Sequence, residues 1–221
     1  MSRPETIGFM GGPGDASATS FVRAVEMLGG AGEPASAVAR GLLERWRESH
    51  RGYHDERHLA EVLAAIDELT GETGRPVVTL AAWYHDAVYE GRPGDDEEAS
   101  ARLVETELAA LSVADETVAE VARLVRSTAA HDLPTDGRSD EAVLHDADLW
   151  ILASPAERFD EYCADVRREY ARVDDEDYRR GRRAVLEPFV ERGRLYATEH
   201  AHGRWTAVAR ANLRRELERL S

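Results

Sequence analysis

A histidine and an aspartate, His85 and Asp86, stand side by side at the end of an apolar run over residues 77–83. Adjacent side chains seldom reach one point from a regular helix, but they can do so at a helix end or in an irregular turn. An imidazole nitrogen and a carboxylate oxygen together suit a divalent metal ion. The doublet alone is a weak signal. Six of the eight histidines lie between His50 and His145, which makes metal binding the leading interpretation.

Three further places in the sequence supply groups that could bind the same metal. His54 and His58 are four residues apart, a spacing that would place both imidazoles on one face of a helix. His131 ends a predicted helix, and Asp146 and Asp148 open an apolar helical run. The spacing of the two aspartates prevents both from sharing one helical face, so we expect only one of them to reach the metal.

Helices must position these groups, because apolar residues recur at helical spacing along nearly the whole chain. Asp95 or Asp96 is expected to cap one helix and Asp115 another. We predict an all-α fold, with one helical domain over residues 17–221 and a flexible Gly- and Pro-rich arm over residues 1–16. The predicted helices include residues 77–88, 144–152, 174–192 and 202–220.

The composition of the chain argues against several classes of function. The formal net charge of −15 argues against a broad nucleic-acid surface, because binding a duplex requires many phosphates to be neutralised. All 28 basic residues are arginine, which excludes Schiff-base lysine chemistry. No run approaches the roughly 20 apolar residues of a membrane span, and residues 1–15 lack a secretory pattern. A cytoplasmic location is therefore expected. The single cysteine, Cys163, agrees with a reducing compartment.

Four short motifs, each with a histidine or an aspartate, follow one another along the chain: Tyr53 to His58, Trp83 to Tyr89, Thr128 to His131 and Asp146 to Leu149. They resemble the HD-domain superfamily and, more narrowly, its group of predicted metal-dependent HD phosphohydrolases. Members of that group carry Tyr-His-x-x-x-His, Trp-Phe-His-Asp-Ala-Val-Tyr, Thr-x-x-His and Asp-x-Asp-Leu elements, so Tyr84 replaces a phenylalanine here. The similarity, which includes the downstream element Arg168-Glu169-Tyr170, extends over about residues 35–215. It is specific for the superfamily but not for a substrate.

The resemblance implies that a histidine, the His-Asp doublet and a distant aspartate bind a divalent metal ion. The matching positions in this chain are His58, His85, Asp86 and Asp148. Asp148 is favoured over Asp146 because it directly precedes the apolar segment of the last element. The metal could be Mn, Fe, Co, Ni, Zn or Mg, and the sequence leaves its identity and the number of ions open.

The implied reaction is metal-assisted hydrolysis of a phosphate ester of a small molecule, such as a nucleotide. His54 or His131 would donate a proton to the leaving oxygen, since imidazole titrates near neutral pH. Glu97 matches a further Asn-Glu-x-x-Ser-Ala element of the group, with aspartate in place of the asparagine. Arginine binds phosphate bidentately. The expected substrate-binding candidates are Arg57, Arg126 and Arg182.

Two other functions stay open. Some HD-domain proteins bind two irons and oxidise C–H or C–P bonds with oxygen, and an extra histidine such as His131 favours that variant. A non-catalytic module that binds a nucleotide and signals through a partner is the third interpretation. The intact set of ligands argues against it. The sequence does not indicate an oligomeric state.

Overall fold

The computed structural model describes residues 13–71 and 74–221. Helices are the only regular elements of this part of the chain, which confirms the predicted all-α class. In chain order the elements are α1 (Pro13–Met27), α2 (Gly32–Trp46), α3 (Glu56–Thr70), α4 (Pro76–Tyr84), α5 (Asp95–Ala110), α6 (Asp115–Ser127), α7 (Asp140–Asp148), the 3-10 helix η2 (Leu149–Ala153), α8 (Ala156–Glu169), α9 (Asp175–Glu191) and α10 (Glu199–Arg219).

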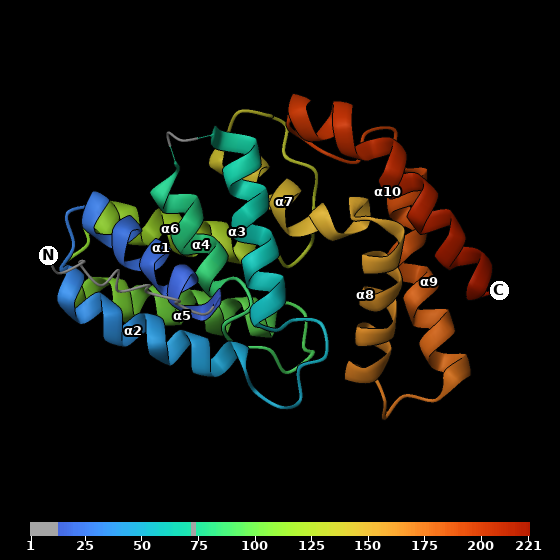
Figure 1. Ribbon diagram of the computed structural model, residues 1–221, viewed down its shortest axis with the longest axis horizontal. Coiled ribbons are helices and arrows are strands. Elements are labelled where there is room, and N and C mark those ends of the chain that lie inside the picture. Colours follow the sequence, from blue (N-terminus) through green and yellow to red (C-terminus); the bar gives the residue numbers. More distant parts are fainter. Residues whose placement is uncertain (1–12, 72–73) are drawn as a thin grey trace, which may run out of the picture.

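The helices form two groups that meet at η2 (Figure 1). In the first group, α4 packs against α1, α3, α5, α6 and α7 and so occupies the centre. In the second group, side chains of α8 and α9 contact each other, and α10 packs against α9 and η2. Because η2 also contacts α3 and α7, the two groups belong to one domain.

The central helix α4 is buried almost all round because its sequence is a continuous apolar run. Its aromatic residues are fixed by hydrogen bonds as well as by packing. The indole of Trp83 donates to Ser20, the backbone carbonyl of Trp83 accepts from the indole of Trp46, and the Tyr84 hydroxyl donates to Glu107. These bonds hold the last turn of α4, and therefore the doublet that follows it, in one position.

Several helix boundaries differ from those expected. Helix α4 ends at Tyr84 rather than near Val88, so the doublet lies at a helix end. Helix α5 has Gly94, with φ 87°, at its N-cap instead of Asp95 or Asp96. The physical reason is that Asp96 accepts hydrogen bonds from the amides of Glu90 and Arg92 and closes the preceding loop.

Two other expectations about helix starts are wrong. Asp115 is the first residue of α6, and Ala114 occupies its N-cap. Helix α1 begins at Pro13, so residues 13–16 of the predicted arm belong to a helix. The rest of that arm, residues 1–12, lies outside the described residues.

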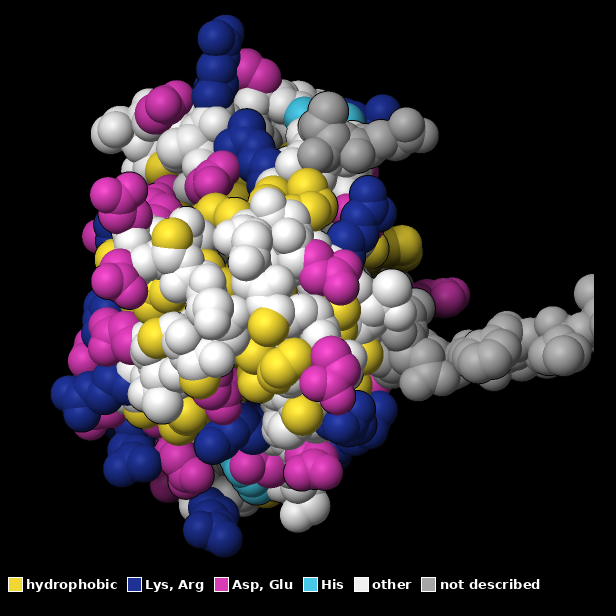
Figure 2. Space-filling model, turned by 90° about the vertical axis from the view of Figure 1, so that its left-hand side faces the viewer, with side chains coloured by type: hydrophobic (Ala, Val, Ile, Leu, Met, Phe, Trp, Pro, Cys, Tyr) yellow, Lys and Arg dark blue, Asp and Glu magenta, His cyan; other side chains and the backbone are white. Residues whose placement is uncertain are grey.

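The surface carries charge of both signs. On the face drawn in Figure 2, arginine and acidic side chains are interspersed, with hydrophobic atoms between them. Among the described residues, none of the helices combines the length and the apolar character needed to cross a bilayer.

Candidate metal centre

Three helices and the turn after α4 supply the four predicted metal ligands. His58 lies in the first turn of α3, whose start is fixed by Asp55, because this N-cap side chain accepts from the amides of Arg57 and His58. His85 is the C-cap residue of α4 and Asp86 lies in the turn beyond it. Asp148 ends α7. The predicted irregular end of a helix is therefore what allows the two adjacent side chains to face one point.

The ligand atoms of His58, His85 and Asp86 lie within 4.8 Å of one another, and a carboxylate oxygen of Asp148 approaches the two imidazoles. Nε2 of His58 and Nε2 of His85 are 3.1 Å apart. Oδ2 of Asp86 lies 3.1 Å from the His85 nitrogen and 3.6 Å from the His58 nitrogen. Oδ1 of Asp148 approaches the same nitrogens at 3.5 and 3.2 Å. We call these four residues the candidate metal centre.

The protonation of the two imidazoles fits a bound cation. Nδ1 of His85 is 2.8 Å from the carbonyl of Ala82; a carbonyl can only accept, so this nitrogen carries a proton, and Nε2 is the nitrogen that would bind a metal once the ring is neutral. Nδ1 of His58 is 2.8 Å from the Tyr53 hydroxyl, whose oxygen can accept a hydrogen bond from it. With Nδ1 as the protonated nitrogen of both rings, the two Nε2 atoms can face one cation. Two imidazoles oriented in this way and two carboxylates are a donor set that suits a divalent metal.

Burial and neighbouring charges shift the pKa values of the candidate metal centre in opposite directions. Burial alone would lower the pKa of His85, but the carboxylates of Asp86 and Asp148 raise it well above its usual value. Burial would raise the pKa of Asp148, yet the imidazoles of His85 and His58 hold it well below its usual range. The centre thus strongly favours having positive charge between its two carboxylates.

His54 lies outside α3, because the helix begins at Glu56; the expectation that His54 and His58 share a helical face is therefore wrong. The two rings are nevertheless close, with centroids 5.7 Å apart. His54 stacks on Tyr89 with a centroid distance of 4.1 Å. The structure thus brings His54 beside the candidate metal centre from a turn.

Glu169 fixes that turn, a role that the sequence pattern did not indicate. Its carboxylate accepts from the amides of Gly52, Tyr53 and His54 at 2.8–2.9 Å. It also binds Nδ1 of His54 at 2.9 Å. Burial alone would raise the pKa of Glu169, but the bonds with His54 and with the backbone hold it at about 2. The Arg168-Glu169-Tyr170 element was the available signal, but nothing in it indicates a contact with a turn far back in the chain.

His131 and Asp146 have distinct places. His131 follows α6 in the left-handed region, with φ 47°, which is uncommon for a residue other than glycine. Its Nδ1 is 3.6 Å from Oδ2 of Asp148, and burial lowers its pKa. Asp146 points elsewhere: it accepts from the amides of Ala197 and Thr198 at 2.8 and 2.7 Å. The structure therefore places Asp148, and not Asp146, at the candidate metal centre.

A cavity of about 470 Å³ adjoins the candidate metal centre, a size that suits a small molecule. Both groups of helices contribute to its wall. The predicted site residues that line it are His54, Asp86, Glu97, His131, Asp148 and Arg182. Aromatic side chains, among them those of Tyr89, Tyr162 and Phe189, cover much of the rest.

Two of the predicted substrate-binding arginines do not line this cavity. Arg57 pairs with Glu61 and Glu161 and lines another, smaller cavity. Arg126 pairs with Glu98 and Glu105. Their charges are already matched by carboxylates, so Arg182 is the one of the three that the structure brings to the candidate site.

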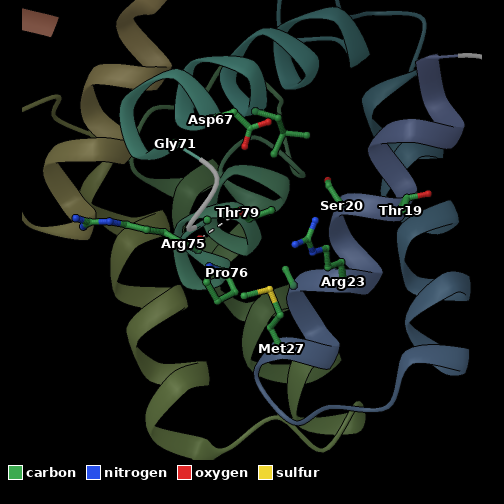
Figure 3. Close-up of a pocket in the computed structure, with 12 residues that line it drawn as sticks. Thr19, Ser20, Arg23, Met27, Asp67, Gly71, Arg75, Pro76 and Thr79 are labelled. Carbon is green, nitrogen blue, oxygen red and sulfur yellow. Dashed lines mark hydrogen bonds between the residues drawn. The ribbon is translucent and has the colours of Figure 1, made fainter. Parts of the chain in front are cut away.

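A larger cavity, with a volume of about 780 Å³, lies elsewhere. It is enclosed by α1, α3 and the start of α4 (Figure 3). Arg23, Asp67 and Arg75 are its charged residues. It contains none of the predicted site residues, so volume alone does not indicate the functional site.

Comparisons of the chain with models of protein families, with curated proteins and with solved structures found no match. The chemistry of the site is therefore inferred from the geometry of the candidate metal centre and its cavity.

Proposed function

We propose that the protein is a metal-dependent phosphohydrolase of the HD type, which cleaves a phosphate ester of a small molecule such as a nucleotide. The observation that carries this proposal is the convergence of His58, His85, Asp86 and Asp148 at one end of a cavity of about 470 Å³. A divalent metal ion bound by these residues would lower the pKa of a coordinated water and neutralise charge on the phosphoryl oxygens.

His54 is the proposed proton donor to the leaving oxygen. Its Nδ1 is occupied by Glu169, so Nε2 is the nitrogen left to exchange a proton with a substrate. Burial lowers the pKa of His54, but the bond with Glu169 and the charges of Asp86 and Asp148 outweigh it and raise the pKa above its usual value. A raised pKa keeps the imidazole protonated near neutral pH, as a general acid requires.

The other residues of the cavity have complementary roles in this proposal. His131, whose pKa is lowered, remains neutral and accepts a hydrogen bond or a proton. Glu97 also lines the cavity, where its carboxylate accepts from the amide of Gly94 and orients the loop before α5. Arg182 supplies the positive charge that an anionic substrate needs.

The test is the variant Asp86→Ala, with Asp67→Ala as a control in the unrelated larger cavity. Elemental analysis of protein purified without chelators should show that Asp86→Ala loses its metal, whereas Asp67→Ala retains it. Phosphate release from a panel of nucleotides and sugar phosphates, measured with Mn²⁺ or Co²⁺, should fall at least about a hundredfold in Asp86→Ala alone. An unchanged metal content in Asp86→Ala would show that Asp86 does not bind the metal and would contradict the proposal.

One observation favours a second function, a di-iron oxygenase. Oδ1 of Asp148 faces His58 and His85, while Oδ2 lies 3.6 Å from Nδ1 of His131. A second metal ion would be held by Asp148 and His131, beside the first. Two irons per chain with the spin-resonance signal of a coupled pair, and no phosphate release with any metal, would favour the oxygenase. Tight nucleotide binding without turnover would instead favour a regulatory module.

A further inference from the structure

Two buried donor groups on α9 lack an acceptor among the described residues. They are the hydroxyl of Tyr178 and Nε of Arg182. Tyr178 is 9% exposed. The two residues are four positions apart in a helix, so their side chains lie on the same face, one turn from each other. Buried polar groups are rarely left without a partner, because the lost hydrogen bonds to water are not replaced.

The positive charge of Arg182 is also unmatched. Its guanidinium donates to the Tyr162 hydroxyl and lies 4.9 Å from the centre of that ring, but it forms no ion pair with a carboxylate of the described residues. Its neighbours on α9 differ: Arg180 pairs with Asp177 and Arg183 with Glu187. A partly buried cation without a counterion is costly, and a bound anion would remove that cost.

Arg182 lies where two cavities adjoin. One is the cavity of about 470 Å³ beside the candidate metal centre. The other, of about 310 Å³, is lined by Tyr178, by apolar and aromatic side chains of α8, α9 and the loop between them, and by Asp177, whose carboxylate pairs with Arg180. Val166, Tyr170 and Val185 line both cavities together with Arg182. None of the candidate metal ligands lines the smaller one.

We propose that Arg182 and Tyr178 form an oxyanion subsite, separate from the candidate metal centre, that binds a second anionic group of the substrate. A carboxylate or a second phosphoryl group has the required chemistry, since either can accept from the guanidinium and from the phenol at once. The substrate class is then a phosphate ester whose organic part joins two anionic ends through an apolar segment. The assignment of the first end to the candidate metal centre rests on the proposed function.

The probes are non-hydrolysable phosphonates in matched sets. One set consists of n-alkyl phosphonates from ethyl to hexyl, the second of ω-phosphonocarboxylates of the same lengths, and the third of the corresponding alkylene bisphosphonates. Isothermal titration calorimetry in the presence of Mn²⁺ gives the affinity of each probe. For each chain length, the affinity of the doubly anionic probe is then compared with that of the alkyl phosphonate. Wild-type protein should bind at least one doubly anionic probe about tenfold more tightly, or more, than its alkyl counterpart. Preference for the second or the third set identifies the group as carboxylate or phosphoryl.

Arg182→Met should abolish this preference, and Arg179→Met, an exposed arginine on the same helix, should leave it intact. Tyr178→Phe keeps the ring and removes only the unpartnered hydroxyl, so it should fold like wild type while the preference falls severalfold. This second variant decides the matter if Arg182→Met fails to fold. The inference would be overturned if Tyr178→Phe and Arg182→Met kept the preference for doubly anionic probes. It would also be overturned if wild type showed no such preference at any probe length.

The two proposals fail in different ways. The subsite is tested by the ratio of two affinities, that of a doubly anionic probe and that of the alkyl phosphonate of the same length. The candidate metal centre is tested separately, by the effect of Mn²⁺ on the affinity of the alkyl phosphonates. Alkyl phosphonates that bind equally with Mn²⁺ and with a chelator would count against the proposed function. An Arg182-dependent preference in the same experiment would still support the subsite.

Discussion

Asp146 and Asp148 are only two positions apart, but their side chains point to different places. Asp146 binds backbone amides, whereas Asp148 lies at the candidate metal centre. Replacing Asp146 with alanine leaves the amides of Ala197 and Thr198 without an acceptor, in a fully buried position. We expect Asp146→Ala to lower the free energy of unfolding by about 2–4 kcal/mol and to retain its metal. Asp148→Ala should instead lose the metal. Urea unfolding and elemental analysis of both variants check this, and a metal-free Asp146→Ala that is folded would contradict it.

Glu169 links the position of His54 to pH. The folded protein holds the pKa of this carboxyl at about 2, against an ordinary value of 4.5. A depressed pKa stabilises the fold above pH 4.5, and this contribution disappears as the pH falls toward 2. We therefore expect wild type to exceed Glu169→Gln in stability by about 3 kcal/mol at neutral pH.

That advantage should shrink between about pH 4.5 and 2, because the wild-type carboxyl takes up its proton there. The difference between the two urea midpoints, measured at each pH, isolates Glu169 from the other buried carboxylates. A difference that stays constant down to pH 2 would show that Glu169 does not anchor the turn as a carboxylate.

At the scale of elements, the contact between the His54 turn and α8 depends on a glycine. A Cβ added at Gly52 would lie 2.4 Å from the backbone oxygen of Asp165 in α8. Backbone cannot move out of the way as a flexible side chain can. We expect Gly52→Ala to push the turn away from α8, to destabilise the protein by about 1–3 kcal/mol and to reduce turnover more than metal content.

Gly41 provides the matched control for this substitution. It lies within α2, and a Cβ added there meets no atom within 4 Å. Because alanine has a higher helix propensity than glycine, Gly41→Ala should raise the free energy of unfolding by up to about 1 kcal/mol and leave activity unchanged. Equal effects of the two substitutions in thermal unfolding would exclude the close approach as the cause.

At the scale of the whole molecule, the candidate metal centre joins distant parts of the chain. A ligand that binds only the folded state stabilises it by about 2.7 kcal/mol at a hundred times its dissociation constant. For a domain of this size that corresponds to a rise in Tm of about 5–10 °C. We expect a chelator to lower the Tm of wild type by this amount and to have little effect on Asp86→Ala. Differential scanning calorimetry provides the comparison.

Local patterns predicted the all-helical fold, and they picked out the four residues that the structure brings together as the candidate metal centre. The doublet at the end of an apolar run and Asp148 before the next one are short-range signals, and both lie where helices end. The sequence could not indicate Glu169 as the anchor of the His54 turn, since that contact depends on how α8 packs. Caps were mispredicted for a similar reason: the carboxylate of Asp96 binds the preceding loop and not the first turn of its own helix.

The candidate metal ligands all come from α3, α4, α7 and the turn after α4, whereas Arg182 and Tyr178 stand on α9. Under the two proposals, the residues that would act on the substrate and those that would select it therefore lie in separate stretches of the chain. A library confined to the α9 positions that border the smaller cavity would sample new specificities without disturbing a single ligand. Duplicated copies of such a gene could diverge in the compounds they accept while keeping their chemistry.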